Sequence, residues 1–264
     1  MYEIGLKLWS VNTDHYLREA KRLYEGKVFD YIELFVVPDT LHTLAVWQAL
    51  KDEIGIPFVI HNAHSATGFN LADARCRSRN AEIYSQTKIF ADTLDAGQII
   101  FHSGVDGDVE EVARQLKSYE EPRALLENKP CLPLPAPHGY KICQGATYEE
   151  ISHVMGETGC GFCLDIGHAV CSANTQGLEP YTFVERLNGL HPAMYHLSDV
   201  GDMTAQYDAH PHLGTGMLDI GRLCDNVFHS EARISIETCK LSKTDLHDYE
   251  ADVKYLRDME AKHQ

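Results

Sequence analysis

The hydrophobic pattern along the chain alternates between two kinds of segment. Short apolar runs rich in β-branched residues are separated by longer segments with apolar residues three and four positions apart. The longer spacing predicts amphipathic helices, and the continuous runs are typical of strands buried on both faces. The expected strands span residues 3–10, 31–37, 58–64, 98–104, 123–129, 161–169, 194–200 and 232–239.

This regular alternation predicts a parallel α/β architecture, and eight strands are the number that a closed (β/α)8 TIM barrel needs. We expect residues 1–264 to form a single barrel domain, because about 250 residues is the usual length of such a barrel. Helices are expected at 16–24 and 41–54, and a last helix from about Thr244 to Lys262. Thr147 and Glu150 have the spacing of a capping box, which marks a helix start before the sixth strand.

The segment 128–147 departs from the alternation because it contains four prolines. Proline excludes a helix interior or a central strand there. The segment follows the fifth expected strand directly, so we expect an ordered loop that covers the active site and forms a wall for the substrate. A passive connector is the alternative that the sequence leaves open.

Six of the apolar runs end on a side chain that can bind a metal ion, and the C-terminal ends of barrel strands are where TIM barrels carry their chemistry. These residues are His61, His102, Glu127, Asp165, His196 and Glu237. Imidazole and carboxylate ligands suit Zn, Mn, Fe and Co. Ligand-type residues on six strands predict a catalytic metal site.

Two further motifs add to this set. One is Asp165-Ile-Gly-His168, and the other runs from Asp208 through His210 to Gly216. With these motifs the chain resembles the endonuclease IV branch of the xylose isomerase-like TIM barrels, from the second expected strand to the eighth. The residues that carry the resemblance are His61, His102, Glu127, Asp165, His168, His196, Asp208, His210 and Glu237.

The resemblance implies a site for up to three divalent metal ions, usually zinc. It assigns the ligands of the first ion to His61, His102 and a bridging Glu127. It assigns those of the second ion to Glu127, Asp165, His196 and Glu237. It assigns those of the third ion to His168, Asp208 and His210.

A cluster of this kind suits phosphoester hydrolysis by metal-bound hydroxide, because neighbouring cations activate water and neutralise the phosphate. We therefore expect a metal-dependent phosphoesterase with Glu127 and Glu237 at its catalytic centre. The competing hypothesis is a sugar or sugar-phosphate isomerase or epimerase, in which the two glutamates exchange a proton beside one divalent ion. That hypothesis leaves His61, His102, Asp208 and His210 without a role.

The net charge of −16 makes the chain as a whole repel polyanions. The loop after the second expected strand, LFVVPDT, lacks the basic residues that the resemblance to DNA-acting enzymes would imply. We expect a small phosphorylated or sugar substrate, or abasic DNA. Weaker candidates for substrate contact are His64, Asn70, Arg75 and His212.

The sequence also bears on location. The N-terminus has no basic segment followed by an apolar run, and nowhere do 18 apolar residues follow one another. We expect a cytoplasmic protein with no membrane partner.

Overall fold

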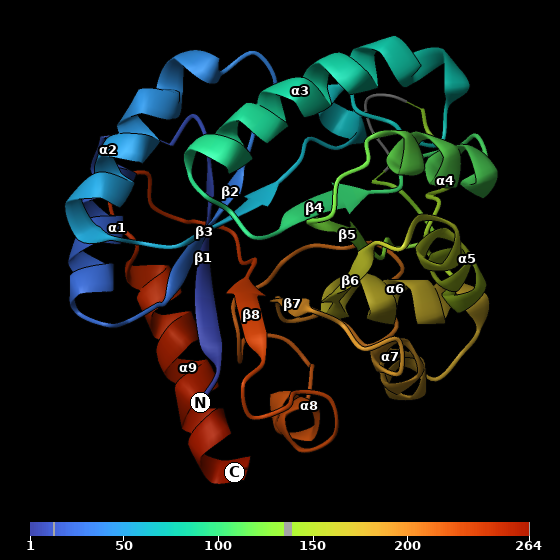
Figure 1. Cartoon of the computed structure of the whole chain (residues 1–264). Coiled ribbons are helices and arrows are strands. Elements are labelled where there is room, and N and C mark those ends of the chain that lie inside the picture. The colour runs from blue at the N-terminus through green and yellow to red at the C-terminus, as the bar shows by residue number, and fades with distance from the viewer. Residues whose placement is uncertain (13, 135–138, 264) are drawn as a thin grey trace.

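A computed structural model describes residues 1–12, 14–134 and 139–263. Within them eight parallel strands close into a barrel in chain order, which confirms the predicted TIM-barrel fold (Figure 1). The strands are β1 (Glu3–Trp9), β2 (Tyr31–Phe35), β3 (Phe58–His61), β4 (Ile99–His102), β5 (Ala124–Glu127), β6 (Gly161–Asp165), β7 (Met194–Leu197) and β8 (Arg233–Ile236).

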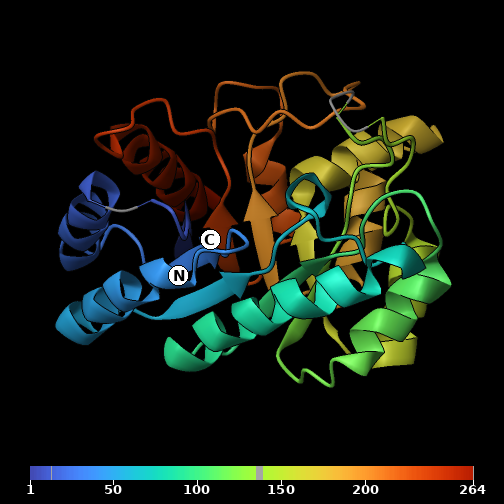
Figure 2. The same cartoon turned by 90° about the horizontal axis from the view of Figure 1, so that it is seen from above.

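Helices surround the barrel, and Figures 1 and 2 show them on the outer side of the strands. They are α1 (His15–Glu25), α2 (Leu44–Ile54), α3 (Arg77–Thr93), α4 (Val109–Ser118), α5 (Tyr148–Thr158), α6 (Ile166–Gln176), α7 (Pro180–Asn188), α8 (Ile220–Asn226) and α9 (His247–His263). Short 3-10 turns are η1 (Leu41–Thr43), η2 (Ser65–Thr67) and η3 (Ala74–Cys76). In the described part of the chain no helix is both long and apolar enough to cross a membrane.

The strands are shorter than the sequence pattern predicts, mainly at their C-terminal ends. The expected strand 161–169 stops at Asp165, because the Asp165 carboxylate accepts a hydrogen bond of 2.6 Å from the backbone N–H of His168. This contact caps α6, so the last residues of the expected strand are helical instead. The capping box of Thr147 and Glu150 is present at the start of α5, as predicted.

The barrel is closed by contacts between the two ends of the chain. β1 pairs in parallel with β8, and the backbone N–H of Tyr2 donates to Glu260 of α9 at 2.6 Å. Both termini therefore lie close together, as Figures 1 and 2 show.

Alternation along the strands places a polar layer above an apolar one inside the barrel. One buried apolar cluster consists of Tyr31, Val59, Ile100, Leu125, Cys163 and Met194, one residue from each of β2 to β7. Side chains two positions apart on a strand point to the same face. The residues two positions further along are Glu33, His61, His102, Glu127, Asp165 and His196. The expected ligands on these strands thus point into the barrel mouth, above an apolar plug.

Candidate metal centre

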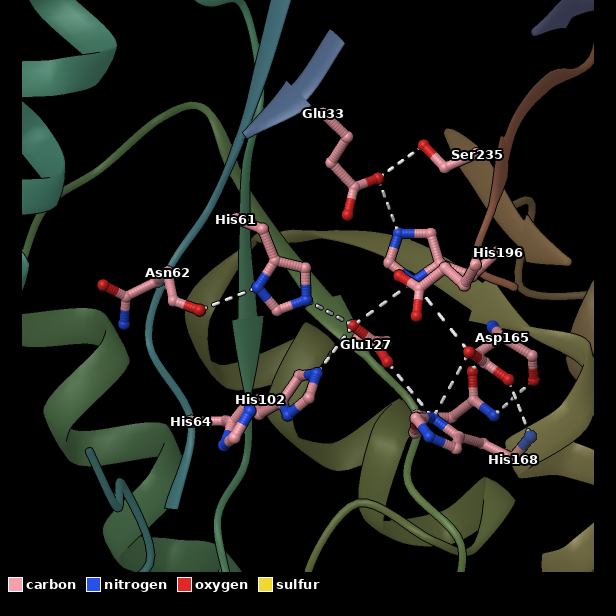
Figure 3. Close-up of polar contacts among 12 residues, drawn as sticks. Glu33, His61, Asn62, His64, His102, Glu127, Asp165, His168, His196 and Ser235 are labelled. Carbon is pink, nitrogen blue, oxygen red and sulfur yellow. Dashed lines mark hydrogen bonds and ion pairs between the residues drawn. The ribbon is translucent and has the colours of Figure 1, made fainter. Parts of the chain in front are cut away.

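The first group of ligand-type side chains lies between β3, β4 and β5. The Nε2 atoms of His61 and His102 are 3.0 and 2.8 Å from the same oxygen of Glu127, Oε2 (Figure 3). The other ring nitrogen of His61, Nδ1, is 2.7 Å from the carbonyl oxygen of Asn62 and donates to it. In a neutral imidazole Nε2 is then an acceptor that faces a carboxylate oxygen. That contact is favourable when the ring is protonated or a cation bridges the two atoms.

The second group surrounds the Nδ1 atom of His196. This nitrogen is 2.8 Å from Glu237, 3.4 Å from Glu127 and 3.9 Å from Asp165. It makes no hydrogen bond of normal geometry among the described residues, although it is buried. The opposite nitrogen, Nε2, donates to Glu33 at 2.9 Å. Three carboxylates facing one unpartnered nitrogen are a suitable set of ligands for a cation.

The third group joins α6 to the loop after β7. The Nδ1 atom of His168 donates to the backbone oxygen of Asn128 at 2.9 Å, and its Nε2 lies 3.4 Å from Asp208. His210 Nε2 is 2.5 Å from the same Asp208 oxygen, and His210 has a positive φ of 48°. Such a left-handed backbone conformation is uncommon for a residue other than glycine.

Buried contacts fix the loop that carries this third group. The carboxylate of Asp199 accepts hydrogen bonds from the backbone N–H groups of Gly214 and Gly216 at 2.8 and 2.9 Å. A Cβ atom on Gly216 would lie 2.3 Å from the backbone oxygen of Val200. Glycine at 216 thus permits the close approach that brings Asp208 and His210 to the barrel mouth.

All nine expected ligands therefore lie at this end of the barrel, in four sets of possible ligand atoms, one of which also includes Glu33. In two of the groups a histidine offers one ring nitrogen to the site while a backbone carbonyl holds the other. This arrangement is typical of histidines that bind metal ions, because the outer hydrogen bond sets the tautomer and the ring orientation.

The charges in the site also favour bound cations. Four carboxylate side chains of the site are at least nine-tenths buried: those of Glu33, Glu127, Asp165 and Glu237. Lys7 forms ion pairs with two of them, Glu33 and Glu237. Burial raises the pKa of Asp165, and the nearby Glu127 carboxylate adds to this effect. Uncompensated buried carboxylates are costly, whereas divalent cations offset their charge. Imidazole and carboxylate donors fit zinc, and also manganese, iron or cobalt.

Sequence reasoning missed two charged members of this layer, Lys7 of β1 and Glu33 of β2. Lys7 Nζ is 3.1 Å from Glu33 Oε1 and also contacts Glu237. The signal was present, since a charged residue inside an otherwise apolar strand is rarely buried without a partner. Glu33 also accepts a hydrogen bond from Ser235 at 2.5 Å. Its two partners fix the carboxylate against His196.

Replacing Glu33 with glutamine is expected to weaken metal binding at the second group by about 10- to 100-fold, because a neutral amide oxygen is a weaker acceptor for His196 Nε2–H than the carboxylate that orients the ring. Competition with a chromophoric chelator measures this affinity. Ser235→Ala, which keeps the carboxylate, serves as the control and should change the affinity much less. Equal affinity in Glu33→Gln and the unchanged chain would contradict this role.

A cavity of about 570 Å³ lies over the three groups of ligand-type side chains. The described residues of the expected wall segment 128–147 that line it include Lys129, Pro130, Leu132, Pro133, Leu134, Tyr140 and Cys143, whereas positions 135–138 lie outside the described residues. Backbone pairing of Val105 with Cys143 ties this segment to the loop after β4. Trp9 and Phe35 form part of the opposite wall, with ring centroids 5.0 Å apart.

His64, one of the weaker candidates, lines this cavity. Its ring is stacked on that of His102 with centroids 5.6 Å apart. Its Nδ1 accepts a hydrogen bond from the backbone N–H of Ala66 at 3.2 Å. Burial, together with the positive charge of Lys129, lowers the pKa of His64 to about 3. The ring is therefore neutral and carries its proton on Nε2.

The other three weaker candidates do not line the cavity, so their positions do not support the expected substrate contact. Asn70 is buried and holds two loops together through the backbone of Val105. Arg75 is exposed and pairs with Asp73. His212 Nδ1 is 2.8 Å from Asp252 of α9. Each lies between a strand and the α-helix that follows it in the sequence, but its side chain makes a structural contact.

Replacing Asn70 with alanine is expected to lower the free energy of unfolding by about 2 kcal/mol and to leave substrate affinity unchanged. The change leaves buried backbone groups of Val105 and Ala72 without their hydrogen-bond partner. Urea unfolding monitored by circular dichroism measures the loss, and Arg75→Ala at an exposed position is the control. If Asn70→Ala had a lower substrate affinity and an unchanged free energy of unfolding, the expected role of Asn70 in substrate binding would be supported.

Comparison with known proteins gives the family. The probable endonuclease 4 of Mycobacterium leprae (strain Br4923) is 26% identical over 216 residues, covering 80% of this chain and 79% of that protein. Among solved structures, a D-tagatose 3-epimerase-like protein superposes with a TM-score of 0.70 at 19% identity, covering 99% of this chain and 100% of that chain. Endonuclease IV from Thermus thermophilus superposes with a TM-score of 0.67 at 20% identity, covering 97% of this chain and 99% of that chain.

These structural likenesses establish the fold, and they include both endonucleases and epimerases. The family model described as xylose isomerase-like TIM barrel matches residues 18–259, nearly the whole barrel. The chain therefore belongs to the xylose isomerase-like TIM barrel family.

Proposed function

We propose that this protein is a metal-dependent phosphoesterase that hydrolyses a small phosphorylated substrate. The observation that carries the proposal is the third group of ligands, which lies directly beside the other two. His168 Nδ1 is 3.1 Å from Glu127 Oε1, while His61 and His102 approach the other oxygen of the same carboxylate. Divalent ions held in such proximity would activate water, neutralise the phosphate and stabilise the leaving oxygen.

The side chains around the cations have supporting tasks in this proposal. Glu127 contacts members of all three groups and so fixes their spacing. Lys7 and Glu33 hold Glu237 and His196 in place from below. His64, neutral with its proton on Nε2, is suited to donate a hydrogen bond to a phosphate oxygen.

The shape and charge of the protein favour a small substrate over abasic DNA. The cavity has walls on two sides, formed by the proline-rich segment and by Trp9 with Phe35. Its volume of about 570 Å³ is in the range of small-molecule sites. The net charge of −16 opposes the approach of a polyanion.

A sugar isomerase or epimerase is the second candidate, and one observation favours it. Glu127 and Glu237 both face His196 Nδ1, together with Asp165, which is the arrangement that a one-metal proton exchange would use. This function would not need the third group, His168 with Asp208 and His210.

One set of assays on protein purified without a chelator or a histidine tag tests the proposal. Phosphate release from p-nitrophenyl phosphate and a panel of sugar phosphates is expected, with a dependence on added zinc or manganese. A plasmid with abasic sites should stay intact, and ketoses in deuterated water should not exchange hydrogen at carbon. Nicking of the plasmid would favour DNA as the substrate, and hydrogen exchange without phosphate release would favour the epimerase.

A further inference from the structure

Two lysines of the cavity lack a carboxylate partner. Lysines 7, 21, 51, 88, 117 and 254 each have a carboxylate within 4.0 Å. Of the remaining lysines, those at 27, 141, 243 and 262 are exposed to solvent. Lys129 and Lys240 are half-buried, line the cavity, and have no such partner among the described residues. The net charge of −16 means that carboxylates are abundant in this chain, yet none in its described part pairs with these two ammonium groups. A partly buried ammonium group without a partner carries a desolvation cost that an anionic ligand would offset.

The two lysines lie on different sides of the barrel mouth. Lys129 follows β5, two positions after the candidate ligand Glu127, and lines the cavity together with His102 and His168. It therefore lies on the side of the barrel mouth that carries β5. Lys240 follows β8, three strands further around the barrel. The two lysines therefore line the same cavity from different sides of the barrel.

The surroundings of Lys240 form a preorganised pocket wall. Its ammonium group donates to the backbone oxygen of Thr238 at 3.4 Å and lies 5.9 Å from the centroid of the Tyr249 ring, and no carboxylate lies within 4.0 Å of it among the described residues. The hydroxyl of Tyr16 donates to the backbone oxygen of Ser242 at 2.5 Å and so joins the start of α1 to the loop after β8. Tyr16, Asn12 and Trp9 line the cavity on this side. Burial lowers the pKa of Lys240, and the more distant carboxylates of Asp248 and Glu237 offset only part of this effect.

We propose that Lys240 forms a second anion site, which binds a phosphate or carboxylate of the substrate at a distance from the phosphoester held over the metal ligands. This inference rests on the proposed function and adds to it a substrate class, a small molecule with two anionic groups. Lys129, beside the metal ligands, contacts the reacting phosphate. Trp9 and Phe35 provide an apolar wall for the part of the molecule that connects the two groups.

Binding of matched pairs of small molecules tests the second site without the need for turnover. Fructose 1,6-bisphosphate is compared with fructose 6-phosphate, and 3-phosphoglycerate with glycerol 3-phosphate, by the shift that each causes in thermal unfolding. In the unchanged chain at least one molecule with two anionic groups should bind about tenfold more tightly than its partner, as expected for one charge-assisted hydrogen bond. A preference in the first pair indicates a phosphate, and one in the second pair indicates a carboxylate.

Variants assign the preference to a residue. Lys240→Ala should abolish the tenfold preference and leave the affinity for molecules with one anionic group unchanged. Lys243→Ala, at an exposed position of the same loop, should keep the preference. Lys129→Ala should lower the affinity for both members of a pair by about tenfold. Lys141→Ala, at an exposed position of the same segment, should leave both affinities unchanged. Lys240→Arg, which keeps the charge, should retain part of the preference and guards against misfolding of the alanine variant.

The outcomes separate this inference from the proposed function. Equal binding of both members in both pairs by the unchanged chain, or a preference that survives Lys240→Ala, overturns the second anion site. A third outcome is that the preference for two anionic groups disappears in Lys240→Ala while the unchanged chain hydrolyses no phosphoester. That result would support the second anion site and reject the proposed phosphoesterase function.

Discussion

The Glu127→Gln variant is expected to lose two metal ions per chain and to hydrolyse phosphoesters at least about 1000-fold more slowly than the unchanged chain. The reason is the position of this carboxylate between the groups. His61 and His102 approach Oε2 within 3.0 Å, and His196 Nδ1 lies 3.4 Å from the same atom. An amide in place of the carboxylate has one oxygen and no charge, so it cannot bridge two cations.

Elemental analysis of purified protein measures the metal content, and phosphate release measures the activity. Glu121→Gln is a suitable control because Glu121 is also buried but pairs with Arg123 outside the barrel mouth. The control should keep its metal ions and its activity. Normal metal content and activity in Glu127→Gln would exclude a bridging role for this residue.

The barrel was predictable because its signal is repeated. Eight apolar runs separated by helical spacing leave few alternative folds, and the rule that strand ends meet at one side places His61, His102 and Glu127 together. The ends of the strands were less predictable. Asp165 is the last residue of β6, and because its carboxylate caps α6, the residues expected to continue the strand to 169 are helical.

The residues that sequence reasoning missed or misplaced lack such repetition. Glu33 and Lys7 stand inside apolar runs, and their mutual contact across β1 and β2 is visible only when the strands are paired. Asn70 and His212 lie in the segments that follow β3 and β7, but the direction of their side chains depends on Val105 and on Asp252, which are distant in sequence. A loop lysine such as Lys240 has no pattern that marks it.

The candidate metal ligands distinguish the two proposed chemistries. Glu127, Asp165, His196 and Glu237 would suffice for a one-metal proton exchange, and the same four would belong to the proposed phosphoesterase site. The distinction lies in the residues outside this set. Asp208 and His210 stand on a loop that Asp199 and two glycines hold in place. The structure thus orders a loop that an isomerase would not use.

The His210→Ala variant is therefore expected to separate the two functions. His210 Nε2 lies 2.5 Å from Asp208, and its removal leaves the third group with two ligands. The variant should contain one metal ion fewer than the unchanged chain, and its phosphoesterase activity should fall by about 100-fold or more, because a neighbouring cation no longer offsets the charge of the phosphate. An isomerase would keep its activity and its metal content.

The neighbouring His212→Ala change is the matched control. His212 is two residues away on the same loop, but it contacts Asp252 of α9 and does not line the cavity. Its loss should lower the free energy of unfolding and leave the metal content as it is, because no ligand group includes it. A difference in metal content between the two variants would place the third cation at Asp208 and His210. Equal metal content in the two variants, together with full isomerase or epimerase activity in His210→Ala, would instead favour the one-metal isomerase or epimerase. The four ligands of that enzyme lie deeper in the barrel.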